Sequence, residues 1–438
     1  MSNATPTATS GSAAVCGRSA DPLVTIEQRV QERARRRPER AEIHELVAEE
    51  IRRWNEDARR GLVDIEITDP DTLTDRALRN LVGYGPLEPL LDDDDVWEIM
   101  INAPDAIFVK RHRGPSGYHH EVFHDDAHVE RTLTKILDDA DGAHRKLDPS
   151  QGLQDAQLPG GARLHIVHPD IARGGHHIVN IRKFTGIAIS SLDELVERGS
   201  LGTAAAAFLR ACVRARRTIV FAGAPGSGKT TLMNCCAAEL DPTLRVVIAE
   251  EVFEADVPLP NVASMQTRAE LPDRPAVDLR RLVAGFLRMA PDFAIVGEVR
   301  DREVLPLLLT LSSGVKGFTT VHAGSTHQAL TRLRFVAQLA DAGRDLPLSA
   351  LNQLVSEAVD VVVHCVRTPQ GPQVAEIAAV ENLAAGPEAT RFTLTPVFAR
   401  RSAGAALTPT GQTPVRLRDD LAAVGLPLES ILEPGGRR

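Results

Sequence analysis

The sequence predicts an α/β fold whose sheet is mostly parallel and covered by helices. Short β-branched or apolar runs alternate with helical patterns from residue 203 onward, as in the strand at 218–222 and the helix at 229–240. Alternation of this kind is typical of parallel sheets with helices on their faces. A glycine-rich segment also joins that strand directly to that helix. Further strands are predicted at residues 244–249, 293–296 and 318–321.

Length and composition bound the class of protein. The chain has 438 residues, which favours two or three domains at about 150 residues each. Its net charge of −9 argues against general nucleic-acid binding, because phosphate neutralisation needs a surplus of Lys and Arg. Five cysteines without a C-x-x-C pair argue against a zinc ribbon or a disulfide framework and favour a reducing compartment. With no long apolar run and no secretory signal, a cytoplasmic location is expected.

Changes in composition and residue pattern divide the chain into six segments. Residues 1–21 are poor in large apolar side chains and are expected to be disordered. A helical region at 22–91 follows, with an apolar stripe through Ile43, Val47 and Trp54. Residues 92–186 mix short strands, a helix and glycine turns, which predicts a small α+β domain. We expect a linker at 187–202, the P-loop core at 203–400 and a loosely ordered tail at 401–438.

The glycine-rich segment at 223–230 matches G-x-x-x-x-G-K-[ST] in full. Its glycines allow backbone N–H groups to converge on phosphate oxygens, and the following helix adds the positive end of its dipole. Lys229, one of only six lysines, supplies a charge to the β- and γ-phosphates, and the Thr230 hydroxyl can ligate Mg²⁺. This predicts binding of ATP or GTP by Gly223, Gly226, Ser227, Gly228, Lys229, Thr230 and Thr231.

Acidic residues follow two of the predicted strands. Glu250, Glu251 and Glu254 come after the strand at 244–249, and Glu298 comes after the strand at 293–296. The carboxyl ends of parallel strands form the ligand crevice, so these acids are expected at the phosphate end of the sheet. An acid there can hold Mg²⁺ through water or orient the water that attacks the γ-phosphate. The alternative for a single Glu after a strand is an ordinary solvated loop residue.

Two further positions bear on the metal and the phosphate. Gly297 stands where many P-loop enzymes have a metal-holding Asp, so retention of Mg²⁺ is expected to fall to Thr230, Glu250 and Glu251. His322 follows the strand at 318–321, again at a carboxyl end. A packing or capping histidine and a sensor of the γ-phosphate are both consistent with that position.

Several segments taken in order carry a resemblance to a known family. The sequence reads LVGYGPLEPL at 81–90, IRKF at 181–184, EEVFE at 250–254, VGEVR at 296–300 and GFTTVHA at 317–323. These segments resemble the secretion ATPases of type II and type IV secretion and of type IV pili. The most similar branch is that of the Flp-pilus, tight-adherence ATPases of the CpaF kind. The resemblance runs from about residue 81 to about residue 383.

The resemblance implies a RecA-like core in a ring, usually a hexamer, at the cytoplasmic face of the membrane, attached through inner-membrane platform proteins. It implies ATP and Mg²⁺ between the two domains of a protomer, with hydrolysis driving domain movement. The roles it implies are phosphate and Mg²⁺ binding by Lys229 and Thr230, activation of water by Glu298, support by Glu254, γ-phosphate sensing by His322, and arginines Arg163 and Arg182 reaching from the N-terminal domain.

Three functions remain open from the sequence. The leading interpretation is an ATP-hydrolysing motor for secretion or pilus assembly. The second is a related motor for conjugative DNA transfer. The third is a nucleotide-binding regulator or scaffold with weak hydrolysis, favoured by two departures from the family pattern. Glu251 replaces the usual Asp, and residues 312–315 lack a second histidine.

Overall fold

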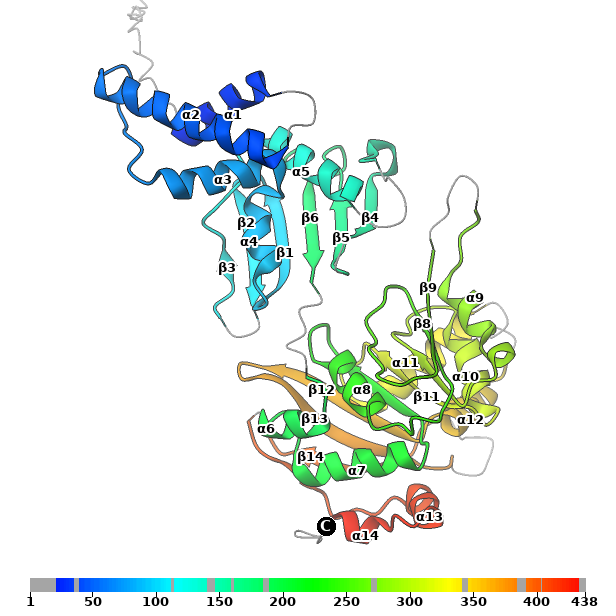
Figure 1. Cartoon of the computed structure of the whole chain (residues 1–438). Helices are drawn as coiled ribbons and strands as arrows, with labels where there is room; N and C mark the ends of the chain where they lie inside the picture. The colour runs from blue at the N-terminus through cyan, green and yellow to red at the C-terminus, as the bar shows by residue number, and fades with distance from the viewer. Residues whose placement is uncertain are drawn as a thin grey trace, which may run out of the picture. The chain divides into compact units, whose positions relative to one another are not determined.

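A computed structural model describes residues 21–34, 39–111, 114–139, 146–158, 161–183, 189–268, 274–340, 346–383, 391–402 and 404–432. The chain divides into two units, residues 1–185 and 186–438 (Figure 1). The disorder predicted for residues 1–21 lies outside the described residues, except at Asp21, which caps the first helix. Within the described ranges, no helix has the length and apolar character needed to cross a lipid bilayer.

The first unit begins with three packed helices, α1 (Pro22–Arg33), α2 (Arg40–Arg59) and α3 (Pro70–Val82) (Figure 1). Asp21 and Asp69 cap α1 and α3 by accepting backbone N–H groups, and each helix has a proline in its first turn. The stripe predicted from the sequence is the buried face of α2. It joins α1 and α3 in one apolar cluster that includes Ile26, Val30, Ile43, Val47, Ile51, Trp54 and Leu78.

A six-stranded antiparallel sheet forms the rest of the first unit, in the order β3-β2-β1-β6-β5-β4. The short helices η1 (Gly85–Leu87) and α4 (Glu88–Asp92) lead into it, and α5 (Asp126–Asp139) packs its apolar face into the same core. A short η2 (Pro149–Gln151) precedes β4. The strands are β1 (Val96–Ala103), β2 (Ala106–Arg111), β3 (Gly117–Tyr118), β4 (Leu153–Gln157), β5 (Arg163–Val167) and β6 (Ile178–Arg182).

A buried polar joint ties α1 to this α+β domain. Oε2 of Glu27, on α1, lies 2.9 Å from Nε2 of His124, and Oε1 accepts a 2.7 Å hydrogen bond from Asn80 of α3. The side chains of Glu27 and His124 are 5% and 16% exposed. The His124 ring packs beside that of His128 on α5. A carboxylate removed from water in this way must be paired, so the joint fixes where α1 docks.

The second unit is built on a nine-stranded sheet in the order β15-β14-β13-β12-β7-β11-β10-β8-β9. Strands β12 to β9 in that order run parallel, and β13, β14 and β15 add an antiparallel extension. The parallel strands are β7 (Ile219–Gly223), β8 (Val246–Glu250), β9 (Val262–Gln266), β10 (Phe293–Val296), β11 (Lys316–Val321) and β12 (Val361–Thr368). The extension comprises β13 (Gly371–Val380), β14 (Leu394–Arg400) and β15 (Leu407–Pro409).

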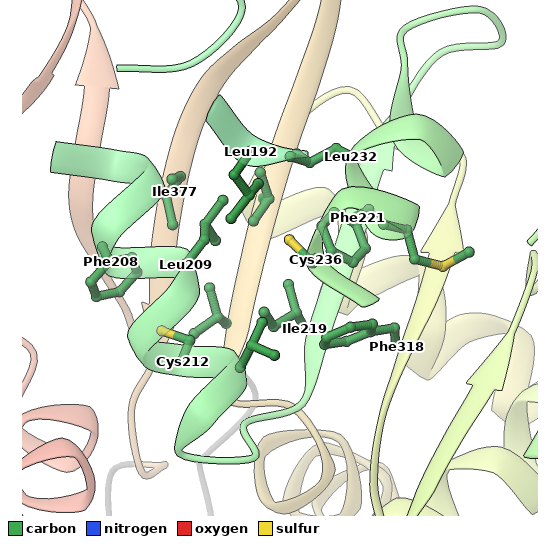
Figure 2. Close-up of a cluster of buried hydrophobic side chains, with 14 of the residues drawn as sticks. Leu192, Phe208, Leu209, Cys212, Ile219, Phe221, Leu232, Cys236, Phe318 and Ile377 are labelled. Atoms are coloured by element: carbon green, nitrogen blue, oxygen red, sulfur yellow. The ribbon is translucent and has the colours of Figure 1, made fainter. Parts of the chain in front are cut away.

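Helices cover both faces of this sheet. Ile219 and Phe221 of β7 face one apolar cluster, and Val220 and Ala222 face the other, as the two-residue period of a strand requires. Figure 2 shows the first cluster, where Phe208 packs toward the sheet. That face carries α6 (Leu192–Glu197), α7 (Thr203–Arg214) and α8 (Lys229–Ala237). The other carries α9 (Leu279–Ala284), η3 (Phe286–Met289), α10 (Val304–Ser312), α11 (Thr326–Leu339) and α12 (Leu348–Ala358).

Two segments contain more regular structure than their sequences predict. The segment predicted as a linker contains α6, whose Leu192 and Leu195 are buried in the core of the second unit. The tail predicted to be loosely ordered contains β15, α13 (Val415–Ala423) and α14 (Leu428–Leu432) through residue 432. Leu417 and Leu421 of α13 enter that same core. Each segment has few apolar residues, and the local sequence does not show that they pack against the core of the second unit.

Asp360 anchors the tail at the amino ends of the central strands. This carboxylate is 3% exposed and accepts the backbone N–H of Thr218 at 2.8 Å. It also pairs with Lys316 at 3.2 Å and with Arg416 of α13. One buried charge therefore joins the starts of β7, β11 and β12 to the C-terminal helices.

Candidate nucleotide-binding site

The loop between β7 and α8 is the most tightly packed part of the site. A Cβ atom added at Gly223 would stand 2.3 Å from the carbonyl oxygen of Cys365, on β12. Gly228 has φ +86°, and a Cβ there would stand 2.8 Å from Cβ of Pro372. No side chain fits at either position, and the curled backbone is the form that presents N–H groups to an anion. Of the predicted binding residues, Gly223 ends β7, and the others lie in this loop or in the first turn of α8, namely Gly226, Ser227, Gly228, Lys229, Thr230 and Thr231.

Lys229 begins α8 and is largely buried against the loop. Its Nζ donates a 3.0 Å hydrogen bond to the carbonyl oxygen of Ala224 and lies 3.4 Å from Nδ1 of His322. The ammonium group is thus held at the loop by backbone and imidazole, where an incoming phosphate would meet it.

Glu298 and His322 follow neighbouring parallel strands, β10 and β11, and their side chains meet. Nε2 of His322 lies 2.8 Å from Oε1 of Glu298, and Nδ1 lies 3.2 Å from the carbonyl oxygen of Gly223. The two side chains are 36% and 35% exposed, so the pair is open to a ligand. The structure therefore brings together three predicted site residues: Lys229, Glu298 and His322.

Surrounding charges keep the Glu298 carboxyl ionised. Burial alone would raise its pKa, but the contacts with His322 and the positive charges of Lys229 and Arg300 outweigh burial, and the pKa is lowered. An ionised carboxylate can accept a hydrogen bond from water, as activation of a nucleophilic water requires.

Glu250 closes the space beside Gly297. It ends β8, is 2% exposed, and its Oε1 accepts the backbone N–H groups of Glu254 at 3.1 Å and Ala255 at 2.9 Å. A Cβ at Gly297 would stand 2.9 Å from Cγ of Glu250. The glycine at the position where other P-loop enzymes have Asp is therefore a packing requirement in this chain, because the Glu250 side chain passes over it.

The other two acids of this segment have separate partners. Glu251 forms an ion pair with Arg300, on the loop that carries Glu298. Oε2 of Glu254 accepts a long, 3.5 Å hydrogen bond from Oγ1 of Thr230. A hydroxyl beside a carboxylate is a suitable donor set for Mg²⁺. Thr230 and Glu254 thus fit a metal ion together, whereas ligation by Glu250 and Glu251 stays a prediction.

Arg367 was not predicted from the sequence. It lies on β12 and donates a 3.0 Å hydrogen bond from Nη1 to the carbonyl oxygen of Gly226. The P-loop is therefore held on one side by the β12–β13 hairpin, through Cys365, Arg367 and Pro372. No local motif marks Arg367, because its position depends on the pairing of β12 with β7.

Arg163 and Arg182 lie in the first unit, directly opposite each other on β5 and β6. On its other side Arg182 is paired with Glu98 of β1, and Nη2 lies 3.2 Å from the Glu98 carboxylate. Like charges opposite each other on adjacent strands are destabilising, so this pairing has a cost for the sheet. Their predicted role toward the phosphates stays a prediction.

Fold and site together define the class of protein. A phosphate-binding loop, with a carboxylate and a histidine at the ends of the adjacent parallel strands, is the arrangement of a P-loop nucleotide-binding protein. Residues 80–393 match the family model described as type II/IV secretion system protein, and the chain belongs to that family.

Two relatives compared by sequence agree with this assignment. The conjugal transfer protein TrbB of Rhizobium radiobacter is 31% identical over 297 residues, covering 66% of this chain and 85% of that protein. The type IV secretion system protein PtlH of Bordetella pertussis is 32% identical over 301 residues, covering 63% and 87%. Among solved structures, the VirB11 ATPase of the Brucella suis type IV secretion system, in complex with sulphate, matches with 28% identity and a TM-score of 0.36, covering 70% of this chain and 97% of that one.

Proposed function

We propose that the protein is an ATP-hydrolysing motor for type II/IV-type protein secretion or for assembly of a Flp or type IV pilus. The observation that carries this proposal is the meeting of Lys229, Glu298 and His322 at the P-loop. A binding module needs the loop and its lysine. The ionised Glu298 beside the phosphate position is what hydrolysis adds.

Each side chain has a part in this proposal. The loop N–H groups and Lys229 bind the β- and γ-phosphates. Thr230 and Glu254 hold Mg²⁺, which when bound neutralises phosphate charge. Glu298 accepts a hydrogen bond from the attacking water and directs it at the γ-phosphate.

His322 connects the phosphate to the carboxylate. Its Nδ1 faces the amine of Lys229 and the P-loop carbonyl, and its Nε2 faces Glu298. A γ-phosphate that draws Lys229 toward itself changes the partners of Nδ1, and thereby the hydrogen bond that Nε2 offers to Glu298. This supports a sensor role over a packing role, because both ring nitrogens face groups of the site.

The assembly around this site is part of the proposal. Relatives are named as type IV secretion system proteins, which supports a place in a secretion apparatus. The homo-hexamer at the cytoplasmic face of the membrane, attached through inner-membrane platform proteins, is proposed from the family resemblance of the sequence segments. Placement in the CpaF-like branch rests on the sequence segments given above. We also propose that Arg163 and Arg182 act on the bound phosphates.

Conjugative DNA transfer is the second candidate, and a specific observation favours it. TrbB, at 31% identity, is named a conjugal transfer protein. The two candidates share the motor and differ in cargo. Prepilin genes beside this gene would favour the pilus, and relaxase genes would favour DNA transfer.

The test of hydrolysis is steady-state phosphate release by the full chain in ATP and Mg²⁺, with its oligomeric state measured by sizing. Wild type is expected to form an oligomer and release phosphate, and Lys229→Ala is expected to abolish turnover. Equal turnover in a clean Lys229→Ala preparation would overturn the proposal. Tight ATP binding by an assembled hexamer that releases no phosphate would instead support the regulator or scaffold.

A further inference from the structure

The loop that carries Glu298 is held at nearly every neighbouring backbone position. Before Glu298, the N–H of Gly297 donates to the carbonyl oxygen of Ala249 at 3.1 Å, which continues the β8–β10 ladder. The carbonyl oxygen of Gly297 accepts the hydroxyl of Thr320 at 2.8 Å. After Glu298, the N–H of Val299 donates to the Thr320 carbonyl oxygen at 3.0 Å. Hydrogen bonds to β8 and β11 thus fix the backbone on either side of Glu298.

The Glu303 carboxylate holds the backbone at the exit from the loop, and the Arg300 side chain there is also ion-paired with Glu251. Oε1 of Glu303 accepts the backbone N–H of Arg300 at 2.6 Å and that of Asp301 at 2.8 Å. Glu303 is 4% exposed, and it precedes the first residue of α10. Hydrogen bonds to a carboxylate are shorter and stronger than neutral ones, and the helix N-terminus favours a negative charge.

The direction of these bonds separates Glu303 from an ordinary helix cap. A capping side chain accepts N–H groups of the first helical turn. Glu303 instead reaches back to two residues that precede α10 and follow Glu298. What it stabilises is therefore the loop, and the helix serves as its rigid support.

We propose that Glu303 is a positioning residue for the hydrolytic carboxylate. It holds the turn after Glu298 so that the Glu298 side chain meets His322 and the water at the γ-phosphate. The inference rests on the proposed function, because it assigns Glu303 an effect on hydrolysis through Glu298. Glu303 itself touches neither nucleotide nor water in this scheme.

The primary test compares Glu303→Ala with Glu303→Gln in the full chain. Alanine removes the acceptor, and a misplacement of about 1 Å can cost roughly 100-fold in rate, so kcat is expected to fall roughly 10- to 100-fold with ATP affinity unchanged. Glutamine keeps an oxygen that can accept both N–H groups and is expected to retain most of kcat. Unchanged kcat in Glu303→Ala, equal losses in the two variants, or a parallel loss of ATP affinity would each overturn the inference.

A double variant tests whether Glu303 acts through Glu298. If it does, Glu303→Ala lowers turnover little further when Glu298 is already Gln, because residues that act as a unit are not additive. Full additivity would contradict the inference. The matched control is Asp278→Ala. It removes the N-cap of α9, in which the Asp278 carboxylate accepts the backbone N–H of Arg281 at 2.8 Å. It is expected to lower the melting temperature and leave kcat unchanged.

Hydrogen exchange separates this inference from the function on which it rests. Amides of residues 300 and 301 are expected to exchange faster in Glu303→Ala than in wild type or Glu303→Gln. A wild type that releases no phosphate would overturn the proposed function, and exchange would still decide whether Glu303 holds the loop. Equal exchange in all three proteins would overturn the inference even where wild-type hydrolysis is brisk.

Discussion

Among the residues that the structure describes, two Glu–His pairs have nearly equal length in very different settings. Glu298 and His322 are 2.8 Å apart at the P-loop, and Glu27 and His124 are 2.9 Å apart between α1 and the segment before α5. The first pair is about a third exposed, and the second is almost buried. In the proposed function the exposed pair serves the nucleotide site of the second unit, whereas the buried pair docks a helix in the first unit. The difference in exposure accompanies this difference in role.

The matched substitution Glu298→Gln should have the largest effect. It removes the charge that accepts a hydrogen bond from water, and loss of general-base assistance typically costs roughly 10²- to 10⁴-fold. We expect kcat to fall by that factor with the melting temperature and ATP affinity near wild type, measured by phosphate release and calorimetry. Wild-type turnover in this variant would show that the Glu298–His322 pair does not take part in hydrolysis, and the contrast with the Glu27–His124 pair would be lost.

Glu27→Gln should have the opposite profile. It leaves the shape of the joint but removes a buried charge paired with His124 and Asn80, and hydrogen bonds to charged groups contribute about 1.5–3 kcal/mol. We expect stability of the first unit to fall by about 2 kcal/mol, seen as faster hydrogen exchange in α1 and α5, while kcat stays at the wild-type value. A loss of kcat with unchanged exchange would contradict this assignment.

His322→Ala and His124→Ala sharpen the comparison further. A sensor modulates the carboxylate without performing the chemistry, so we expect His322→Ala to lower kcat about tenfold, equivalent to about 1.4 kcal/mol. His124→Ala should leave kcat unchanged. Equal kcat in His322→Ala and wild type would favour the packing role for His322.

The smallest effect should come from mild acid. Burial lowers the pKa of His128 to about 3, with a further contribution from the charge of His124, and burial also lowers the pKa values of His119 and His177. Because these pKa values lie below that of an unfolded histidine, about 6.5, their contribution is complete above that pH and is lost as the pH falls below it. We expect the protection of amides in α5, measured as exchange relative to the intrinsic rate at each pH, to fall from about pH 7 to pH 5 more than in α8. His128→Gln should reduce that loss of protection, and identical pH profiles of protection in α5 and α8 would contradict the prediction.

Much of the second unit was predictable from the sequence, because its parallel strands are buried on both faces and read as short apolar runs. The run at 293–296 coincides with β10, and the P-loop lies between β7 and α8. The antiparallel extension was missed: β12 pairs with both β7 and β13, and those partners are distant in sequence. The tail was misread because Leu417 and Leu421 become informative only against the core they enter.

The sequence predicted which side chains gather at the candidate site, but it predicted few of the contacts between them. Motif and strand ends identify Lys229, Glu298 and His322, since carboxyl ends of adjacent strands must converge. The sequence could not show that Glu250 turns back onto the backbone of Glu254 and leaves Glu254 beside Thr230. The Glu250 side chain can take this position only because Gly297 has no side chain in its way.

The Asp360 ion pairs have a consequence for synthesis of the chain. Lys316 is translated before Asp360, but Arg416 of α13 follows 56 residues later. Until Arg416 has left the ribosome, the carboxylate has only part of its final neutralisation, and the leucines of α13 are missing from the core. The second unit therefore reaches its native state only after α13 has been synthesised and has packed, and a premature stop before residue 416 would leave a buried charge short of a partner.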